Sequence, residues 1–370
     1  MSHHIYCHIP FCAAKCPYCD FYSESGRSDE CVAKVIDAMC RETDSLEPKN
    51  KISTIYIGGG TPSFIDAGHI ERLLAAIDAH FEVESDAEVT IEVNPSSLTA
   101  DKAKRYRDIG INRVSVGVQS LHDEHLRTLG RLHDSASGAK CLRTLAEAGF
   151  TNISADLITA VPGQSIEDVT EDLKKLAEFG VTHISTYSLT IEEGTPFFHK
   201  YGDSIEDLVP PEAEREMYHA LRAELKLLGY IPYEISNSCL PGYESRHNSS
   251  YWEGEEYYGI GAGAHGYIGR RRYAHPDDID SYICDPLTAV TEEVMSDEDI
   301  MHEYPFLMLR TSEGISLAGF EYRFGRSFME MFGEVVRDNA ARGLLIVNDG
   351  YVRLTDKGID WSNKVMSEFL

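Results

Sequence analysis

The sequence predicts an α/β protein in which a partial (β/α)6 barrel precedes a smaller C-terminal α+β domain of winged-helix type. One observation is the alternation, from residue 3 to residue 189, of apolar β-branched runs with helical patterns whose outer faces are charged. A second is that polar, glycine-rich stretches follow these apolar runs. A third is the change of rhythm beyond Thr190, where the alternation stops.

Six strand–helix units account for the first part of the chain. Each predicted strand is short and rich in Ile, Val and Thr, and each predicted helix has a charged outer face. This alternation is typical of a parallel sheet with right-handed crossovers, and six units are too few for a complete eight-stranded barrel. The predicted strands are residues 3–9, 53–57, 88–93, 113–118, 152–158 and 183–189, and the predicted helices are residues 31–46, 70–80, 100–109, 136–148 and 166–179.

The loops after these strands predict where a ligand binds. GGGTPS follows the second strand, EVNPSS ends the third, GVQS ends the fourth and DLITAVPGQ ends the fifth. A loop with three cysteines follows the first strand. Because ligands of parallel sheets bind beyond the carboxyl ends of the strands, these loops predict one site at one end of the sheet.

The second half of the chain predicts two further segments beyond the barrel of residues 1–200. Residues 201–290 contain a helix at 212–228 and an irregular, aromatic and glycine-rich stretch, which we interpret as a family-specific extension. Residues 291–370 contain short helices and two strands, 344–347 and 351–354, that flank Asn-Asp-Gly, a hairpin signal. We expect this winged-helix-like domain to have a structural or docking role.

Composition restricts the class of protein. With 34 Lys and Arg against 61 Asp and Glu, the formal charge is −27, so the surface repels phosphate backbones and we expect no nucleic-acid partner. No apolar run is long enough to span a membrane, and the N-terminus lacks a signal-peptide pattern, so we expect a cytoplasmic protein. In that reducing compartment, nine cysteines favour metal or redox chemistry over a disulfide framework.

The most specific motif is a window of eight residues that contains Cys12, Cys16 and Cys19. Thiolates are soft ligands that select iron–sulfur clusters or zinc. Three thiolates on a [4Fe–4S] cluster leave one iron open to a small molecule, whereas a closed zinc site needs a fourth ligand, which His8 offers. Burial in a core alone does not account for three cysteines this close together.

The C-x3-C-x2-C spacing followed by an aromatic residue, with GGGTP after the second strand, resembles the radical S-adenosylmethionine (SAM) superfamily. The resemblance implies a [4Fe–4S] cluster on the three cysteines, with SAM chelating the open iron. YCHIPFC, GVQS and HNSSYW are similar to one branch, which contains the oxygen-independent coproporphyrinogen III dehydrogenases and the HemW-type haem chaperones. This similarity extends over most of the chain.

The resemblance implies which residues meet the amino-acid end of SAM. Tyr6 would lie beside the cluster and SAM. Gly59, Gly60 and Thr61 would present backbone groups to the amino end, and Glu92 would accept from the ammonium group. Glycine suits this place because it allows close backbone approach. Read alone, GGGTP is also typical of a tight strand–helix turn in which Thr61 is the N-cap.

By the same resemblance, Arg131 would pair with the SAM carboxylate, and Gln119 and Asp156 would hold the ribose hydroxyls. Arg offers a two-pronged contact to a carboxylate, and carboxylates accept from neighbouring hydroxyls. Taken singly, each of these residues is more typical of a helix cap or a loop hydrogen bond. Together with the cysteine motif, the set favours ligand binding.

Two features separate the branches. The dehydrogenases resemble C-x3-C-x2-C-x-C, but Phe21 stands at the position of the last cysteine. They also have a substantial segment before the cluster, whereas eleven residues precede Cys12 here. Both features favour the HemW type, whose H-N-x-x-Y-W motif is associated with haem; His247 is then a candidate axial ligand of haem b. The basic run Arg270, Arg271 and Arg272 either meets propionates or, as we favour, balances neighbouring acids.

We therefore predict a haem chaperone that uses a [4Fe–4S] cluster and SAM to deliver haem to an apo-haemoprotein such as a respiratory enzyme. The first alternative is a radical-SAM coproporphyrinogen III dehydrogenase, an activity that Phe21 makes doubtful. The second is a zinc-bound interaction module. An electron donor for the cluster is expected, and a homodimer and a peripheral membrane contact are compatible with the sequence.

Overall fold

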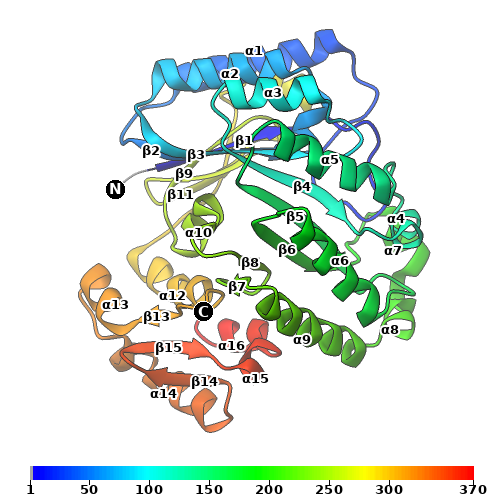
Figure 1. Cartoon of the computed structure of the whole chain (residues 1–370). Coiled ribbons are helices and arrows are strands. Elements are labelled where there is room, and N and C mark those ends of the chain that lie inside the picture. The colour runs from blue at the N-terminus through cyan, green and yellow to red at the C-terminus, as the bar shows by residue number, and fades with distance from the viewer. Residues whose placement is uncertain (1–2) are drawn as a thin grey trace.

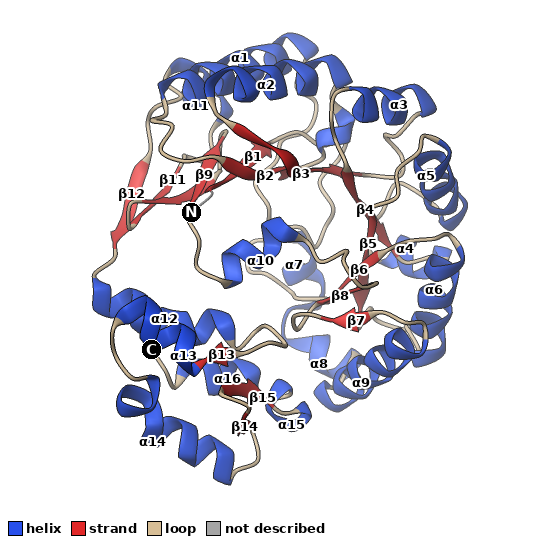
Figure 2. Ribbon diagram, turned by 60° about the vertical axis from the view of Figure 1, so that its left-hand side comes forward, coloured by secondary structure: helices blue, strands red, loops and turns tan. Residues whose placement is uncertain are grey.

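A computed structural model describes residues 3–370 of the chain. In that range a twelve-stranded sheet curves through the molecule, with most of its helices on the convex side (Figure 2). The six predicted strands are all present, parallel and adjacent in chain order, which confirms the partial barrel. They are β1 (His3–Ile9), β2 (Ile52–Gly59), β3 (Val83–Val93), β4 (Arg113–Gln119), β5 (Ile153–Thr159) and β6 (His183–Ser188).

The five longer helices between these strands form because each has a capped start and an apolar inner face. Ser28 and Thr99 accept a hydrogen bond from the first turn of their helices, and Ser165 with Asp168 forms a reciprocal capping box. A short helix, α4, was not predicted. The helices are α1 (Asp29–Ser45), α2 (Ala67–His80), α3 (Ala100–Asp108), α4 (Asp123–Thr128), α5 (Ser135–Glu147) and α6 (Ile166–Glu178).

Strands from the middle of the chain extend the same sheet at both edges (Figure 1). β9 lies parallel to β1 and places Gly259 opposite Tyr6, while β8 lies antiparallel to β6. These strands are too short for a clear alternation in the sequence. The segment contains α7 (Pro196–Tyr201), α8 (Ile205–Leu208), α9 (Pro211–Leu227), β7 (Ile231–Pro232), β8 (Asn237–Cys239), α10 (Arg246–Trp252), β9 (Tyr257–Ile260), β10 (His265–Ile268), β11 (Arg271–Ala274), α11 (Ile279–Cys284) and β12 (Val290–Val294).

The C-terminal unit lies below the barrel in Figure 1 and has its own core, which includes Phe320, Phe328 and Phe332. Its predicted hairpin is present, and Asp349 and Gly350 both have positive φ, as a tight two-residue hairpin turn requires. The elements are α12 (Asp297–Met308), β13 (Ile315–Ser316), α13 (Leu317–Phe324), α14 (Phe328–Ala341), β14 (Leu345–Asn348), β15 (Tyr351–Leu354), α15 (Asp356–Ile359) and α16 (Ser362–Ser367).

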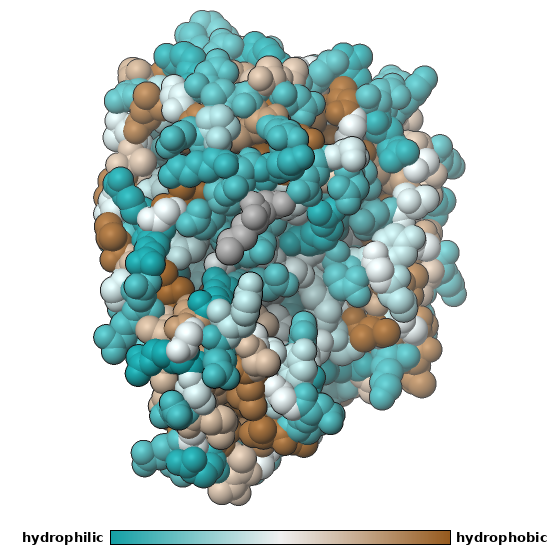
Figure 3. All heavy atoms as spheres, turned by 90° about the vertical axis from the view of Figure 1, so that its left-hand side faces the viewer, coloured by the Kyte–Doolittle hydropathy of each residue, from teal (hydrophilic) through white to brown (hydrophobic). Residues whose placement is uncertain are grey.

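The surface agrees with the acidic composition. The face in Figure 3 is mainly hydrophilic, with apolar residues more frequent toward the lower part of the view. Two arginines of the basic run pair with acids, the alternative that the sequence favours: Arg270 contacts Asp297, and Arg272 contacts Glu303 and Glu293. Arg271 donates to the Thr291 hydroxyl instead. Among residues 3–370, no helix has the length and apolar character needed to cross a bilayer.

Candidate functional site

A cavity of about 610 Å³ lies at the carboxyl ends of the barrel strands, where the loops predicted it. We call it the large cavity. Its walls come from the cysteine loop and from β2 to β6, and Asn248 of α10 reaches it from the concave side of the sheet. Eight residues predicted from the sequence line it: Cys19, Gly59, Gly60, Thr61, Glu92, Gln119, Arg131 and Asp156.

The cysteine loop runs along the edge of the large cavity. The Cys12 Sγ atom lies 3.3 Å from the Thr61 hydroxyl, and Arg131 Nη1 donates to the Cys16 Sγ atom at 3.4 Å. Cys19 lies on the wall itself. All three thiols are free and only partly buried, so the loop presents three unpaired thiols next to the cavity.

The glycine turn after β2 allows the chain to pass close to its neighbours. Gly59 has φ +111°, and a Cβ there would lie 2.9 Å from the His8 ring. A Cβ on Gly60 would lie 2.8 Å from the backbone oxygen of Phe11. Thr61 is the N-cap of a short 3-10 turn, Pro62–Phe64, as the alternative interpretation expects, but its side chain makes no capping hydrogen bond. The N–H groups of Gly60 and Thr61 donate to the backbone oxygens of Ile9 and Phe11 at 2.9 and 2.8 Å, and the turn lines the large cavity.

Two carboxylates stand on the wall of the large cavity. Glu92 accepts a hydrogen bond from the Tyr56 hydroxyl at 2.8 Å, and burial raises its pKa to about 7. Burial also raises the pKa of Asp156, which accepts from the Ser115 hydroxyl. A carboxylate in such surroundings gains from a cationic ligand, and SAM provides an ammonium and a sulfonium group.

Two guanidinium groups, those of Arg131 and Arg113, line the same cavity, and some of their N–H groups have no hydrogen-bond partner among the described atoms. Arg131 Nη2 donates to the Gly117 backbone oxygen at 3.0 Å, but its buried Nε has no partner among the described atoms. Arg113, only 1% exposed, lines the cavity and lacks partners there for both Nε and Nη1. Buried donors of this kind are costly unless an acceptor is supplied, and a ligand carboxylate would supply one.

Arg113 was missed as a site residue. The sequence contained a signal, since it placed a charged residue at the start of a strand that is buried on both faces. Tyr56 was missed as well, although a tyrosine among the Ile residues of β2 is a signal of the same kind. Both side chains point into the cavity because they share a face with Glu92 and Ser115 on neighbouring strands.

Gln119 ends β4 with φ +65°, a left-handed conformation that is unusual for a residue other than glycine. The pairing of β4 with β5 shifts its register between Val116 and Gln119. This irregularity directs the Gln119 side chain to the cavity wall. Strain of this type persists mainly where the surroundings hold it, and it is common at ligand sites.

Tyr6 lies one layer behind the cavity rather than on its wall. Its hydroxyl donates to His8 Nδ1 at 3.0 Å, and its ring stacks on Tyr56, with ring centres 6.2 Å apart. His8 Nε2 in turn donates to the Tyr22 backbone oxygen at 2.8 Å. Both ring nitrogens of His8 are therefore engaged away from the thiols, unlike the zinc ligand of the second alternative.

His247 is also outside the cavity, and it is 1% exposed. Its Nδ1 is hydrogen-bonded to the Thr54 hydroxyl at 2.6 Å and its Nε2 to the Tyr251 hydroxyl at 2.8 Å. Its ring stacks on Tyr56 at 5.1 Å, and burial lowers its pKa well below the ordinary value. In this conformation the imidazole is neutral and has no free nitrogen for an iron atom.

The donor set of the large cavity fits a [4Fe–4S] cluster with SAM. Three thiols border a cavity that contains two carboxylates for a cationic ligand and two guanidinium groups for a carboxylate. The glycine turn leaves room at the point where the cysteine loop meets β2. Phe21, 68% exposed, covers part of the mouth in place of a fourth thiol.

Comparison with known proteins agrees with this geometry. Residues 6–176 match the radical SAM superfamily, and residues 295–361 match the HemN C-terminal domain. The chain is 38% identical to the haem chaperone HemW of Lactococcus lactis, over 99% of this chain and 96% of that protein. It is 36% identical to HemW of Bacillus subtilis, over 99% and 98% of the two chains.

The fold is also that of a solved structure, coproporphyrinogen III oxidase (HemN) of Escherichia coli. The TM-score is 0.84, with 23% identity over 100% of this chain and 90% of that one. At this identity the likeness shows a common fold. It covers the whole of this chain, so the C-terminal unit is part of the common fold. The full-length similarity at higher identity decides the branch: the chain belongs to the HemW haem chaperone family of the radical SAM superfamily.

Proposed function

We propose that this protein binds haem and delivers it to haem-dependent proteins, with a [4Fe–4S] cluster and SAM bound at the large cavity. The observation that carries the proposal is the combination of three free thiols beside a zwitterion-binding cavity with Phe21 at the fourth thiol position. Relatives similar over the full length are named haem chaperones. When bound, the cluster and SAM supply one-electron chemistry.

In this proposal the chain's own residues bind and orient SAM. Cys12, Cys16 and Cys19 hold the cluster, while Gly59, Gly60 and Glu92 receive the amino end. The side chains Arg131 and Arg113 receive the carboxylate, and Gln119 and Asp156 hold the ribose. Tyr6 acts indirectly, since it supports the ring of Tyr56. The division into residues 1–200, 201–290 and 291–370 is part of the same proposal.

Ligation of the haem iron by His247 stays a prediction, and it has a structural cost. The ring must leave Thr54 or Tyr251 before either nitrogen reaches a metal. A cytoplasmic location, an electron donor for the cluster, a homodimer and a peripheral membrane contact also stay predictions.

The test is haem transfer. The reconstituted protein, loaded with one haem per chain, is mixed with a haem-free respiratory enzyme, and recovery of that enzyme's activity is followed with and without SAM. We expect recovery that depends on the loaded chaperone and is slower with free haem at the same concentration. Equal recovery with free haem would contradict the proposal.

The second candidate function is coproporphyrinogen dehydrogenation, which the common fold with HemN favours. Mass spectrometry of an anaerobic reaction with SAM, a reductant and coproporphyrinogen III separates the two functions. We expect no protoporphyrinogen. Formation of protoporphyrinogen in catalytic amounts would make the enzyme function the better proposal.

A further inference from the structure

A second cavity, of about 320 Å³, lies between strands β9 to β11 and helices α12 and α13. We call it the aromatic cavity, and it shares no lining residue with the large cavity. We propose that haem is held here by one edge of the macrocycle, in a site separate from that of SAM. This inference rests on the proposed function and specifies where the haem binds.

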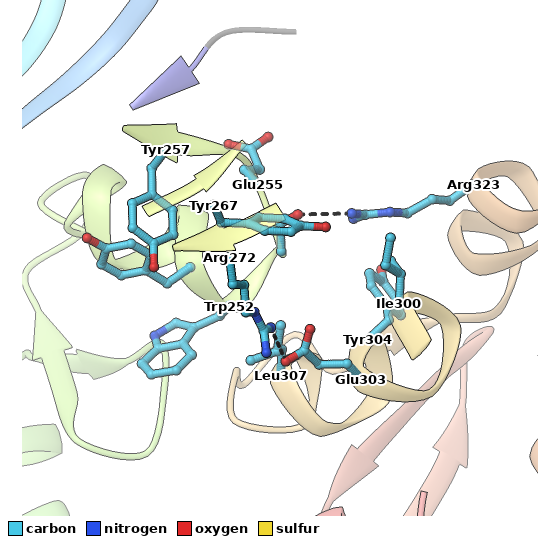
Figure 4. Close-up of a pocket in the computed structure, with 12 residues that line it drawn as sticks. Trp252, Glu255, Tyr257, Tyr267, Arg272, Ile300, Glu303, Tyr304, Leu307 and Arg323 are labelled. Carbon is cyan, nitrogen blue, oxygen red and sulfur yellow. Dashed lines mark hydrogen bonds and ion pairs between the residues drawn. The ribbon is translucent and has the colours of Figure 1, made fainter. Parts of the chain in front are cut away.

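The walls of the aromatic cavity suit a flat ring. Figure 4 shows Tyr257 and Tyr267 from the sheet, Trp252 from the end of α10, and Ile300, Tyr304 and Leu307 from α12 around one space. Aromatic side chains bury large apolar areas and stack on planar ligands. These residues come from the middle segment, whose strands extend the barrel sheet, and from the C-terminal unit, so the site exists only where the two meet.

One cation at the rim is available for a carboxylate. Arg323 donates to the backbone oxygens of Glu253 and Gly254 at 2.7 and 3.1 Å, and its guanidinium lies 5.1 Å from the centre of the Tyr304 ring. Within residues 3–370 it forms no ion pair with a carboxylate inside 4 Å, in a chain of charge −27. Arg272 differs, because it is paired with Glu303. A haem propionate would therefore meet Arg323.

Trp252 provides a second unused polar group. Its indole Nε1 is buried and has no hydrogen-bond partner among the described atoms, while Arg310 stacks on its ring at 4.4 Å. A buried N–H donor without an acceptor lowers stability.

The small volume of the aromatic cavity suits a ligand that the protein must release to an acceptor. A volume of about 320 Å³ is near the lower end for small-molecule sites, so one edge of the macrocycle enters and the remainder stays outside. The exposed part would be accessible to an acceptor protein. A site that enclosed the whole ring would slow transfer, because affinity differences appear mainly in the dissociation rate.

The position of His247 then has an explanation other than iron ligation. Its Nε2 is hydrogen-bonded to the hydroxyl of Tyr251, which lines the aromatic cavity, and its ring stacks on Tyr56, which lines the large cavity. His247 is therefore a positioning residue between the two sites. Asn248 on the same helix lines the large cavity, so α10 contributes to both.

The experiment is a haemin titration of the full-length, cluster-reconstituted protein, followed in the Soret region. Ile300→Trp fills the aromatic cavity, and Arg323→Gln removes the free cation. We expect the Kd for haemin to rise at least tenfold for Ile300→Trp, because the larger side chain occupies the space of the ring edge, and at least tenfold for Arg323→Gln, because a charged contact is lost. Tyr322→Ala, next to Arg323 but 95% exposed, is the matched control and should stay within twofold of wild type.

Esterified porphyrin tests the propionate contact separately. The dimethyl ester of haemin should bind the wild type about tenfold more weakly than haemin, whereas Arg323→Gln should bind both forms alike. SAM affinity, measured on the same variants, reports correct folding and should not change. A Tyr187→Ala variant alters the wall of the large cavity instead.

The outcomes separate the two proposals. Stoichiometric haem binding that neither cavity-filling nor Arg323→Gln weakens would overturn the location and leave the chaperone function standing. Weakening by Tyr187→Ala instead would place haem in the large cavity and likewise overturn the inference. If the wild type binds no haem in a saturable way, the proposed function itself fails, and the aromatic cavity fails with it.

Discussion

Replacement of Glu92 by glutamine should stabilise the cluster-free protein and at the same time weaken SAM binding. The amide oxygen introduced by Glu92→Gln can still accept from the Tyr56 hydroxyl, so the substitution removes the charge and keeps that contact. Burial is the main cause of the raised pKa of Glu92, and the nearby Asp156 carboxylate adds to it. Both effects disfavour the ionised form of Glu92 in the folded chain.

The magnitude follows from the pKa. The folded value is about 7 against an ordinary value of 4.5, so between these pH values the folded state binds more protons than the unfolded state. Stability therefore falls as pH rises from 4.5 through 7. The full difference corresponds to about 3 kcal/mol; because water in the cavity solvates part of the charge, we expect a gain of about 1–3 kcal/mol for Glu92→Gln at pH 8 and almost none at pH 4.5.

Urea unfolding of the cluster-free protein at pH 4.5, 6, 7 and 8, followed by circular dichroism, measures this difference. Comparison with the wild type at each pH cancels the repulsion among the other acids, and the exposed Glu321→Gln serves as control. A difference that does not change with pH, or a variant less stable than wild type at pH 8, would refute the reasoning. In the reconstituted protein, calorimetry should show at least tenfold weaker SAM binding, because the ammonium loses its charged partner.

Three further predictions concern the cluster loop, the glycine turn and the helix behind the cavity. Cys16→Ser should prevent stable cluster assembly, measured as iron and sulfide per chain, whereas the buried Cys141→Ser should assemble normally. Gly60→Ala should weaken SAM binding at least tenfold by calorimetry while the protein stays folded, because its Cβ meets backbone that cannot move aside; unchanged affinity would contradict the assigned approach. His247→Phe keeps a ring but leaves Tyr251 without its partner, so the free energy of unfolding should fall by about 2–4 kcal/mol, and a loss below 0.5 kcal/mol by urea unfolding would show that the network contributes little to stability.

Much of the barrel was predictable because its signals are local. Five of the six predicted strands agree with the observed ones to within two residues at each end, and β3 begins five residues earlier than predicted, at Val83. Alternation of side chains, capping residues such as Ser165, and the hairpin turn at Asp349 act within a few positions of themselves. The spacing of the cysteines is likewise a property of one loop.

The edges of the sheet and the depth of the site were not predictable in this way. β9 joins β1 across about 250 positions of the chain, and nothing in its four residues specifies that partner. Arg113 and Tyr56 point into the cavity only because three neighbouring strands align them. Tyr6 and His247, expected at the ligands, lie behind Tyr56 because that ring occupies the wall between them and the cavity.

By itself, then, the sequence determined the order of the strands and helices, the thiol-bearing loop and the end of the sheet where ligands bind. The tertiary structure alone decided which side chains reach the cavity, which of them remain without hydrogen-bond partners, and that a second, aromatic cavity forms where the middle segment and the C-terminal unit meet. The physical reason is that periodicity and capping depend on neighbours along the chain, whereas burial, side-chain direction and pKa depend on neighbours in space.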